Sequence, residues 1–91
     1  MSVKIELYPF LYQYIENSPQ TAQVDGKTVG ECLEQLISRY PQLRTKLFDK
    51  KGKLYLNLHV YLNGENAYPD ELTRRVRDGD QVHILPINTG G

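Results

Sequence analysis

Alternating apolar and polar positions predict several β-strands, each with one buried face. Within residues 3–8 the apolar side chains occupy every second position, and Pro9 ends the run. The longest alternation covers residues 54–63, and Asn63-Gly64 at its end is a dipeptide typical of hairpin turns. We expect strands over residues 3–8, 21–24, 54–63 and 82–85.

One long helix is predicted between the second and third strands. Thr28 and Glu31 match the capping box, in which a hydroxyl and a carboxylate three residues apart satisfy the N–H groups of the first turn. Pro41 disfavours helical geometry at the residue before it, so the helix should end near Tyr40. The apolar stripe of this helix consists of Val29, Cys32, Leu33, Leu36, Ile37 and Tyr40.

This order of elements predicts an α+β fold, a mixed sheet of four to five strands packed on one main helix. The other face of the sheet is expected to be open to solvent. The chain of 91 residues is long enough for one core of two layers. We expect one domain over residues 1–87, followed by a flexible tail over residues 88–91.

Composition removes several classes of function. Eleven basic and eleven acidic side chains cancel, so no net field attracts nucleic acid or an anionic membrane. The sequence lacks the roughly 20 consecutive apolar residues of a membrane span and the apolar core of a signal peptide. The single cysteine, Cys32, fits a reducing compartment. We therefore expect a cytoplasmic protein without nucleic-acid or membrane partners.

The internal sequence lacks the motifs of an enzyme. His59 and His83 have no convergent cysteine or carboxylate, and we interpret them as surface residues rather than metal ligands. Cys32 falls within the helix stripe, where packing as a small apolar residue is favoured over nucleophilic chemistry. H-x-x-x-H, a Cys pair and EF-hand spacing are all absent from the sequence, so we expect no metal. Neither a P-loop nor G-x-G-x-x-G occurs, so we expect no intrinsically bound cofactor.

Two tyrosines face away from the leucines of the long predicted strand. Tyr55 and Tyr61 would be exposed on a one-sided sheet, as aromatic residues are in many partner-binding surfaces. Cross-strand pairing that only stabilises the sheet explains them equally well. The sequence leaves both interpretations open.

The tail is the remaining place for chemistry. Residues 87–91 span roughly 17 Å when extended, which is enough to enter the pocket of another enzyme. Gly90 and Gly91 have no side chain to clash with a narrow channel. The α-carboxylate of Gly91 is ionised at neutral pH and can attack the α-phosphate of ATP, after which a sulfur or amine nucleophile can take the acyl group. A frayed end without function is the alternative.

The chain resembles the MoaD/ThiS sulfur carrier proteins, which are ubiquitin-like β-grasp domains. The residues that carry the resemblance are VYLNG at 60–64, DGDQVHILP at 78–86 and the final Gly90-Gly91, behind an opening strand and a capped helix. The resemblance implies that residues 1–87 form a ubiquitin-like β-grasp domain. It also implies a carrier that an activating enzyme modifies, not an enzyme.

In this family the terminal glycine is adenylated by a ubiquitin-activating-like adenylyltransferase of the MoeB/ThiF type, which uses ATP, and is converted to a thiocarboxylate. The sulfur then passes to a sulfur-accepting biosynthetic enzyme of the molybdopterin, thiamin, cysteine or methionine pathways. The resemblance implies that Gly91 carries the adenylate and the thiocarboxylate, and that Gly90 and Thr89 thread the channel of the enzyme. It assigns the docking of partners to Tyr61, His83 and Leu85.

Two other functions remain open at this point. The chain could be a ubiquitin-like interaction module with a disordered tail, or a ubiquitin-like modifier that is joined to lysines. The polar segment over residues 49–53 resembles carriers of amino-acid sulfur assimilation more than the shortest thiamin-type members.

Overall fold

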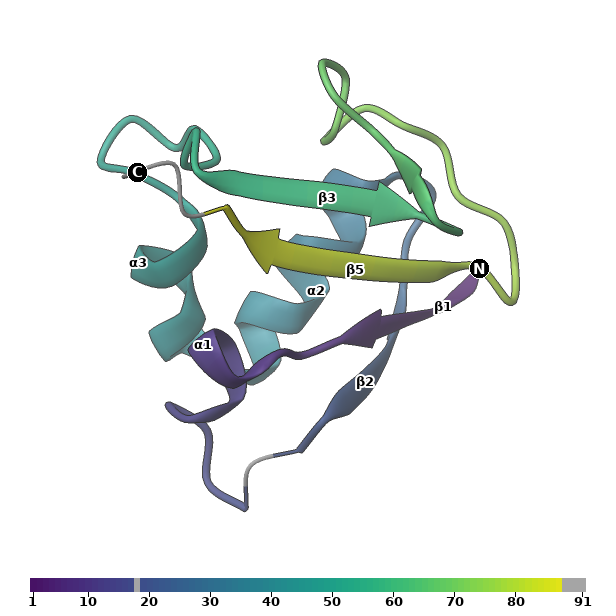
Figure 1. Ribbon diagram of the computed structural model, residues 1–91. Helices are drawn as coiled ribbons and strands as arrows, with labels where there is room; N and C mark the ends of the chain where they lie inside the picture. The colour runs from purple at the N-terminus through teal and green to yellow at the C-terminus, as the bar shows by residue number, and fades with distance from the viewer. Residues whose placement is uncertain (18, 88–91) are drawn as a thin grey trace.

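A five-stranded mixed sheet lies against one main helix in the computed structural model of the chain, which describes residues 1–17 and 19–87 (Figure 1). The strands lie side by side in the order β2-β1-β5-β3-β4. Their bounds are Ser2–Glu6 for β1, Thr21–Asp25 for β2, Leu58–Leu62 for β3, Glu65–Asn66 for β4 and Gln81–Pro86 for β5. The predicted α+β class, with a mixed sheet on one main helix, is confirmed.

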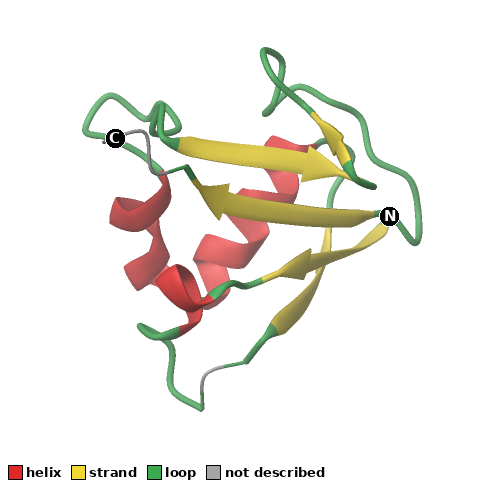
Figure 2. Ribbon diagram, in the orientation of Figure 1, coloured by secondary structure: helices red, strands yellow, loops and turns green. Residues whose placement is uncertain are grey.

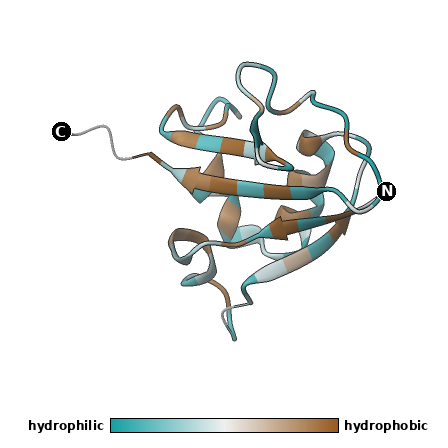
Figure 3. Ribbon diagram, turned by 45° about the vertical axis from the view of Figure 1, so that its right-hand side comes forward, coloured by the Kyte–Doolittle hydropathy of each residue, from teal (hydrophilic) through white to brown (hydrophobic). Residues whose placement is uncertain are grey.

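The central strand is β5, which runs parallel to β1 on one side and antiparallel to β3 on the other. In this register Val82 stands between Ile5 and Leu62, and Ile84 stands opposite Val60. Val82, Ile84, Ile5 and Val60 have no exposed surface. The middle of the core is therefore built by strands from both ends of the sequence, and hydropathy alternates along them (Figure 3).

Helix α2 (Val29–Arg39) covers one face of the sheet (Figure 1). The Thr28 hydroxyl accepts a hydrogen bond from the Glu31 N–H at 3.1 Å, which confirms the predicted cap. The Glu31 carboxylate accepts from the N–H of Lys27, one residue before the cap, at 3.0 Å. The helix ends before Pro41, as predicted. Its buried residues are Val29, Cys32, Leu33, Leu36 and Ile37.

Three short helical pieces lie at the end of the sheet where β5 ends (Figure 2). They are α1 (Pro9–Tyr12), the 3-10 turn η1 (Pro41–Leu43) and α3 (Arg44–Leu47). Each contributes one fully buried leucine to the core, namely Leu11, Leu43 and Leu47. Over the described residues, none of the helices has the length and hydropathy needed to cross a membrane.

The predicted strand over residues 54–63 is wrong in its first half. β3 begins only at Leu58, because the Leu58 N–H bonds to the carbonyl oxygen of Tyr55 at 3.1 Å and closes a turn. Leu56, which was expected to face the core, is 97% exposed as a result. Leu54 instead forms an isolated bridge with Phe48. The other three predicted strands match the observed ones to within two residues at each end.

The turn at Asn63-Gly64 is confirmed. Both residues have positive φ, 52° and 85°, and Leu62 pairs with Glu65 across them, which is the pattern of a two-residue hairpin loop. The Asn63 side chain also accepts from the Gln81 N–H at 2.9 Å. The hairpin is thereby fastened to the beginning of β5.

Candidate functional site

The three predicted docking residues lie together on the sheet face away from α2. Tyr61 on β3 stands opposite His83 on β5, and Leu85 follows His83 on the same face. All three side chains are half-buried. With Tyr8 and Gly64 they line a shallow hollow of about 220 Å³. We call this group of residues the sheet hollow.

Tyr8 was missed by the sequence reasoning. Its hydroxyl lies 2.9 Å from Nδ1 of His83, and the two ring centroids are 6.0 Å apart. Tyr8 continues the polar-face alternation of Lys4 and Glu6, which is the one signal that the sequence contains. Only the parallel β1–β5 pairing, with Glu6 opposite His83, brings the tyrosine to the hollow.

The sheet hollow is suited to binding. Aromatic side chains with a polar tip, such as tyrosine, are enriched at the centre of protein interfaces. The hydrogen bond between Tyr8 and His83 fixes the two rings relative to one another, so the apolar surface beside Leu85 is already formed. The arrangement can accept an apolar side chain of a partner protein.

The root of the tail is held close to the same strand end. The Ile87 N–H donates to the carbonyl oxygen of Asn57 at 2.7 Å, one step beyond the last pair of the β3–β5 ladder. Thr89, Gly90 and Gly91 lie outside the described residues, so their roles remain predictions, as does the division of the chain after residue 87. Leu85 lies on β5 and Ile87 directly follows the end of that strand, so the hollow and the root of the tail are two residues apart.

Cys32, His59 and Tyr55, the other residues considered from the sequence, do not line the sheet hollow. Cys32 is fully buried, and burial raises the pKa of its thiol, which confirms that it packs as an apolar residue. His59 is half-buried beside Tyr61, with ring centroids 6.4 Å apart, whereas a surface position was expected. The Tyr55 hydroxyl donates to the Thr45 carbonyl at 3.1 Å, so Tyr55 does not share the sheet hollow with Tyr61.

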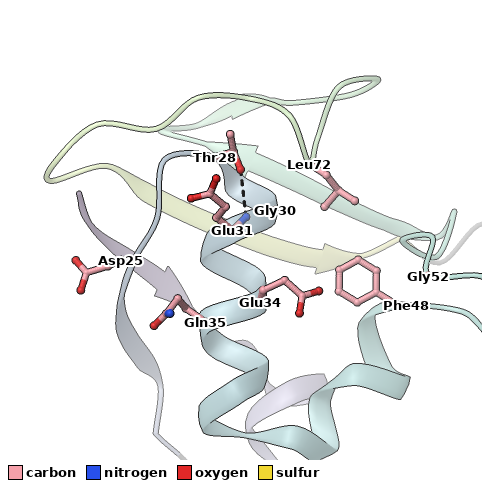
Figure 4. Close-up of a pocket in the computed structure, with 9 residues that line it drawn as sticks. All are labelled: Asp25, Thr28, Gly30, Glu31, Glu34, Gln35, Phe48, Gly52 and Leu72. Atoms are coloured by element: carbon pink, nitrogen blue, oxygen red, sulfur yellow. Dashed lines mark hydrogen bonds between the residues drawn. The ribbon is translucent and has the colours of Figure 1, made fainter.

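An acidic recess of about 550 Å³ borders the first turns of α2 (Figure 4). Its carboxylates do not converge, since Asp25 and Glu34 point in opposite directions in Figure 4. Glu34 forms a salt bridge of 2.7 Å with Arg44, and Glu31 bonds to the backbone of Lys27. Within the described part of the chain, no three His, Cys, Asp or Glu side chains are placed to hold a metal ion. Glu31 and Glu34 are therefore engaged in local structural contacts, and we do not assign a binding site to the recess.

Comparison with known proteins decides the family. The family model described as ThiS family matches residues 11–91. The chain belongs to the ThiS family. This ThiS-family chain is 38% identical over 69 residues to the small archaeal modifier protein 1 of Haloferax volcanii, a match that covers 75% of this chain and 76% of that protein. It is 28% identical over 94 residues to the sulfur carrier protein CysO of Mycobacterium tuberculosis, with complete coverage of both.

Solved structures agree with this placement. The crystal structure of small archaeal modifier protein 1 from Haloferax volcanii superimposes with a TM-score of 0.85 at 30% identity and covers both chains completely. A chain of the Amycolatopsis orientalis BexX/CysO complex gives a TM-score of 0.84 at 28% identity, over 98% of this chain and 99% of that one. The predicted β-grasp fold and MoaD/ThiS membership are confirmed. Membership gives this ThiS-family chain the general role of a sulfur carrier, a substrate rather than an enzyme.

Proposed function

We propose that the carboxylate of Gly91 is adenylated by an activating enzyme and then converted to a thiocarboxylate that donates sulfur in biosynthesis. The ThiS-family match, which runs through Gly90 and Gly91, supports this proposal most directly. The alignment to CysO, a protein named as a sulfur carrier, extends over the same residues. The sulfur acceptor is an enzyme of molybdopterin, thiamin, or cysteine or methionine synthesis.

The chemistry takes two steps. A carboxylate oxygen of Gly91 attacks the α-phosphorus of ATP, and pyrophosphate leaves. A sulfide nucleophile then attacks the acyl carbon, and AMP leaves with the electrons of the broken C–O bond. One sulfur thus replaces one carboxylate oxygen. A MoeB/ThiF-type adenylyltransferase supplies the ATP site, so the carrier itself needs no catalytic side chain.

The fold contributes a docking surface and a tail root that are fixed relative to each other. Tyr61, His83 and Leu85 take the docking role in this proposal, and Tyr8 joins them through its hydrogen bond to His83. Beyond Ile87, the remaining residues reach about 14 Å when extended. An enzyme that docks on the sheet hollow therefore meets the Gly91 carboxylate within a limited radius, with Thr89 and Gly90 passing along its channel.

Intact-mass spectrometry tests the proposal. After incubation with a purified MoeB/ThiF-type adenylyltransferase of the same genome, ATP and sulfide, the chain is expected to exchange one oxygen for one sulfur. A variant without Gly90 and Gly91 should remain unmodified, although its fold, whose core ends at β5, should give an unchanged circular dichroism spectrum. Omission of ATP is the matched control. Sulfur incorporation by the deletion variant, or none by the full chain with any such enzyme of the genome, refutes the proposal.

A second candidate is a lysine-conjugating modifier. The 38% identity to a protein named small archaeal modifier protein 1 favours it. The adenylation step is shared, but a lysine amine then attacks the acyl carbon and an isopeptide bond forms. Lysines of other proteins that carry the C-terminal residues of this chain, in the absence of free thiocarboxylate, would identify this function. An interaction module with an inert tail would instead keep its activity after Gly90 and Gly91 are deleted.

A further inference from the structure

Leu56 exposes 97% of its surface because the Tyr55–Leu58 turn points it away from the core. Tyr68, from a distant part of the sequence, is 71% exposed and borders the same hollow of about 550 Å³. The apolar residues lining this hollow, which we call the Leu56 patch, are Leu54, Leu56, Tyr68, Pro69 and Leu72. A contiguous exposed apolar group of this kind marks an interaction surface.

Leu56 forms a ridge, since it also borders a second hollow of about 630 Å³ on its other side. Lys51 and Lys53 line that second hollow, and both are exposed. An Asp49 carboxylate oxygen accepts from their backbone N–H groups at 2.8 and 3.0 Å, which fixes the shape of the loop. Asp70 and Glu71 line the first hollow, so the ridge is apolar at its crest, basic at the rim with the two lysines and acidic at the opposite rim.

The ridge stands at the root of the tail. Asn57, the neighbour of Leu56, accepts the hydrogen bond of the Ile87 N–H at 2.7 Å. Residues 88–91 reach at most about 14 Å from that point, so an active site that encloses Gly91 lies within that distance of Ile87, which is bonded to the neighbour of Leu56. Among the described residues, the hollows beside Leu56 share no lining residue with the sheet hollow at Tyr8. A protein that takes the tail thus meets a surface separate from the one already described.

We propose that Leu56 is a second docking point for the adenylyltransferase that takes the tail. Its side chain enters an apolar pocket of the enzyme beside the channel entrance, and Lys51 and Lys53 face acidic residues at the rim of that pocket. This inference rests on the proposed function, since the adenylyltransferase is the enzyme that must enclose the Gly91 carboxylate together with ATP. A docking role for Leu56 explains why this leucine is solvent-exposed at the root of the tail.

Steady-state adenylation, followed as pyrophosphate release, tests the inference with the full chain and the purified adenylyltransferase. Leu56→Ser is expected to raise the KM for the carrier about 10- to 100-fold, because burial of a leucine is lost, and to leave kcat unchanged, because the tail is intact. Lys51→Glu combined with Lys53→Glu should also raise KM, and the increase should shrink in high salt. The matched control is Tyr14→Ser, which removes another large exposed hydrophobic side chain that lines neither hollow and should not change KM.

Isothermal titration calorimetry measures the affinity of the same enzyme for the carrier without ATP, and this affinity separates the inference from the proposed function. Weaker binding of Leu56→Ser supports the second docking point even where no thiocarboxylate is formed. Equal binding and equal KM for Leu56→Ser and the wild type overturn it, while thiocarboxylate formation by both keeps the proposed function. The remaining outcome is that light scattering shows a dimer for the wild type and a monomer for Leu56→Ser, with an unchanged KM. That result assigns the patch to a second copy of the chain and also overturns the second docking point.

Discussion

Replacing Gly30 with alanine is expected to destabilise the protein, although alanine is the better helix former. Gly30 lies in the first turn of α2, and its N–H donates to the Leu72 carbonyl oxygen at 2.9 Å. The neighbouring Val29 N–H donates to the Arg74 carbonyl oxygen at 2.9 Å. A Cβ atom on residue 30 would lie 2.8 Å from that same Leu72 oxygen, so the backbone of one segment would have to move.

The expected loss follows from these contacts. Alanine gains at most about 1 kcal/mol of helix propensity over glycine. Displacement of the Leu72–Arg74 segment weakens two backbone hydrogen bonds of about 1 kcal/mol each, and the crowding itself costs about 1 kcal/mol or more. The free energy of unfolding should fall by about 2 kcal/mol, which corresponds to a Tm lower by roughly 10 °C in a domain of this size.

Urea and thermal unfolding, followed by circular dichroism, measure this difference. Ser38→Ala is the matched control, because Ser38 is an exposed residue of α2 whose hydroxyl donates to the Gln35 carbonyl oxygen within the helix. That variant should be as stable as the wild type or slightly more stable. If Gly30→Ala gains stability as Ser38→Ala does, the close approach of Leu72 to the helix is not a constraint, and the reasoning is refuted.

Three further predictions concern a carboxylate, a thiol and the docking face. The Asn63 side chain and the Arg77 N–H donate hydrogen bonds to the Asp80 carboxylate and hold its pKa below the usual value. The stability that the ionised Asp80 adds is therefore present above about pH 4 and is lost as the pH falls through the lowered pKa. Wild type and Asp80→Asn should therefore differ in unfolding free energy near neutral pH and converge in acid; a constant difference across urea titrations contradicts this. Burial raises the pKa of the Cys32 thiol and shields it from reagents. Cys32 should therefore react with iodoacetamide at least about 100-fold more slowly in the folded chain than in the urea-unfolded chain, as measured by mass spectrometry. Leu85→Ser should raise the carrier's KM in adenylation about 10-fold with kcat unchanged, and a fall in kcat alone would exclude the docking role.

Features with a local cause were predictable from the sequence. The Thr28 cap and the apolar stripe of α2 depend on residues a few positions apart, and so does the Asn63-Gly64 turn. Leu56 was mispredicted because the alternation of residues 54–63 continues through a turn that backbone groups close. Any side chain is compatible with that hydrogen bond, so periodicity alone contains no sign of it.

Part of the candidate site could be placed from the sequence, because that part depends on local alternation along two strands. Tyr61, His83 and Leu85 could be placed on one face because they alternate with buried residues of two strands. Tyr8 could not, because its contact with His83 depends on a parallel pairing between strands 75 residues apart in the chain. The close approach of Leu72 to Gly30 is likewise a meeting of distant segments. Contacts of this kind are set by the tertiary fold.

The central place of β5 has a mechanical consequence. An enzyme that draws residues 88–91 into a channel pulls on this strand, which pairs with β1 over residues 81–83 and with β3 over residues 82–86. The load therefore reaches the β3 ladder first, at residue 86, and reaches the β1 ladder only from residue 83. Force applied at the tail is therefore passed into the middle of the sheet and not along a free edge strand.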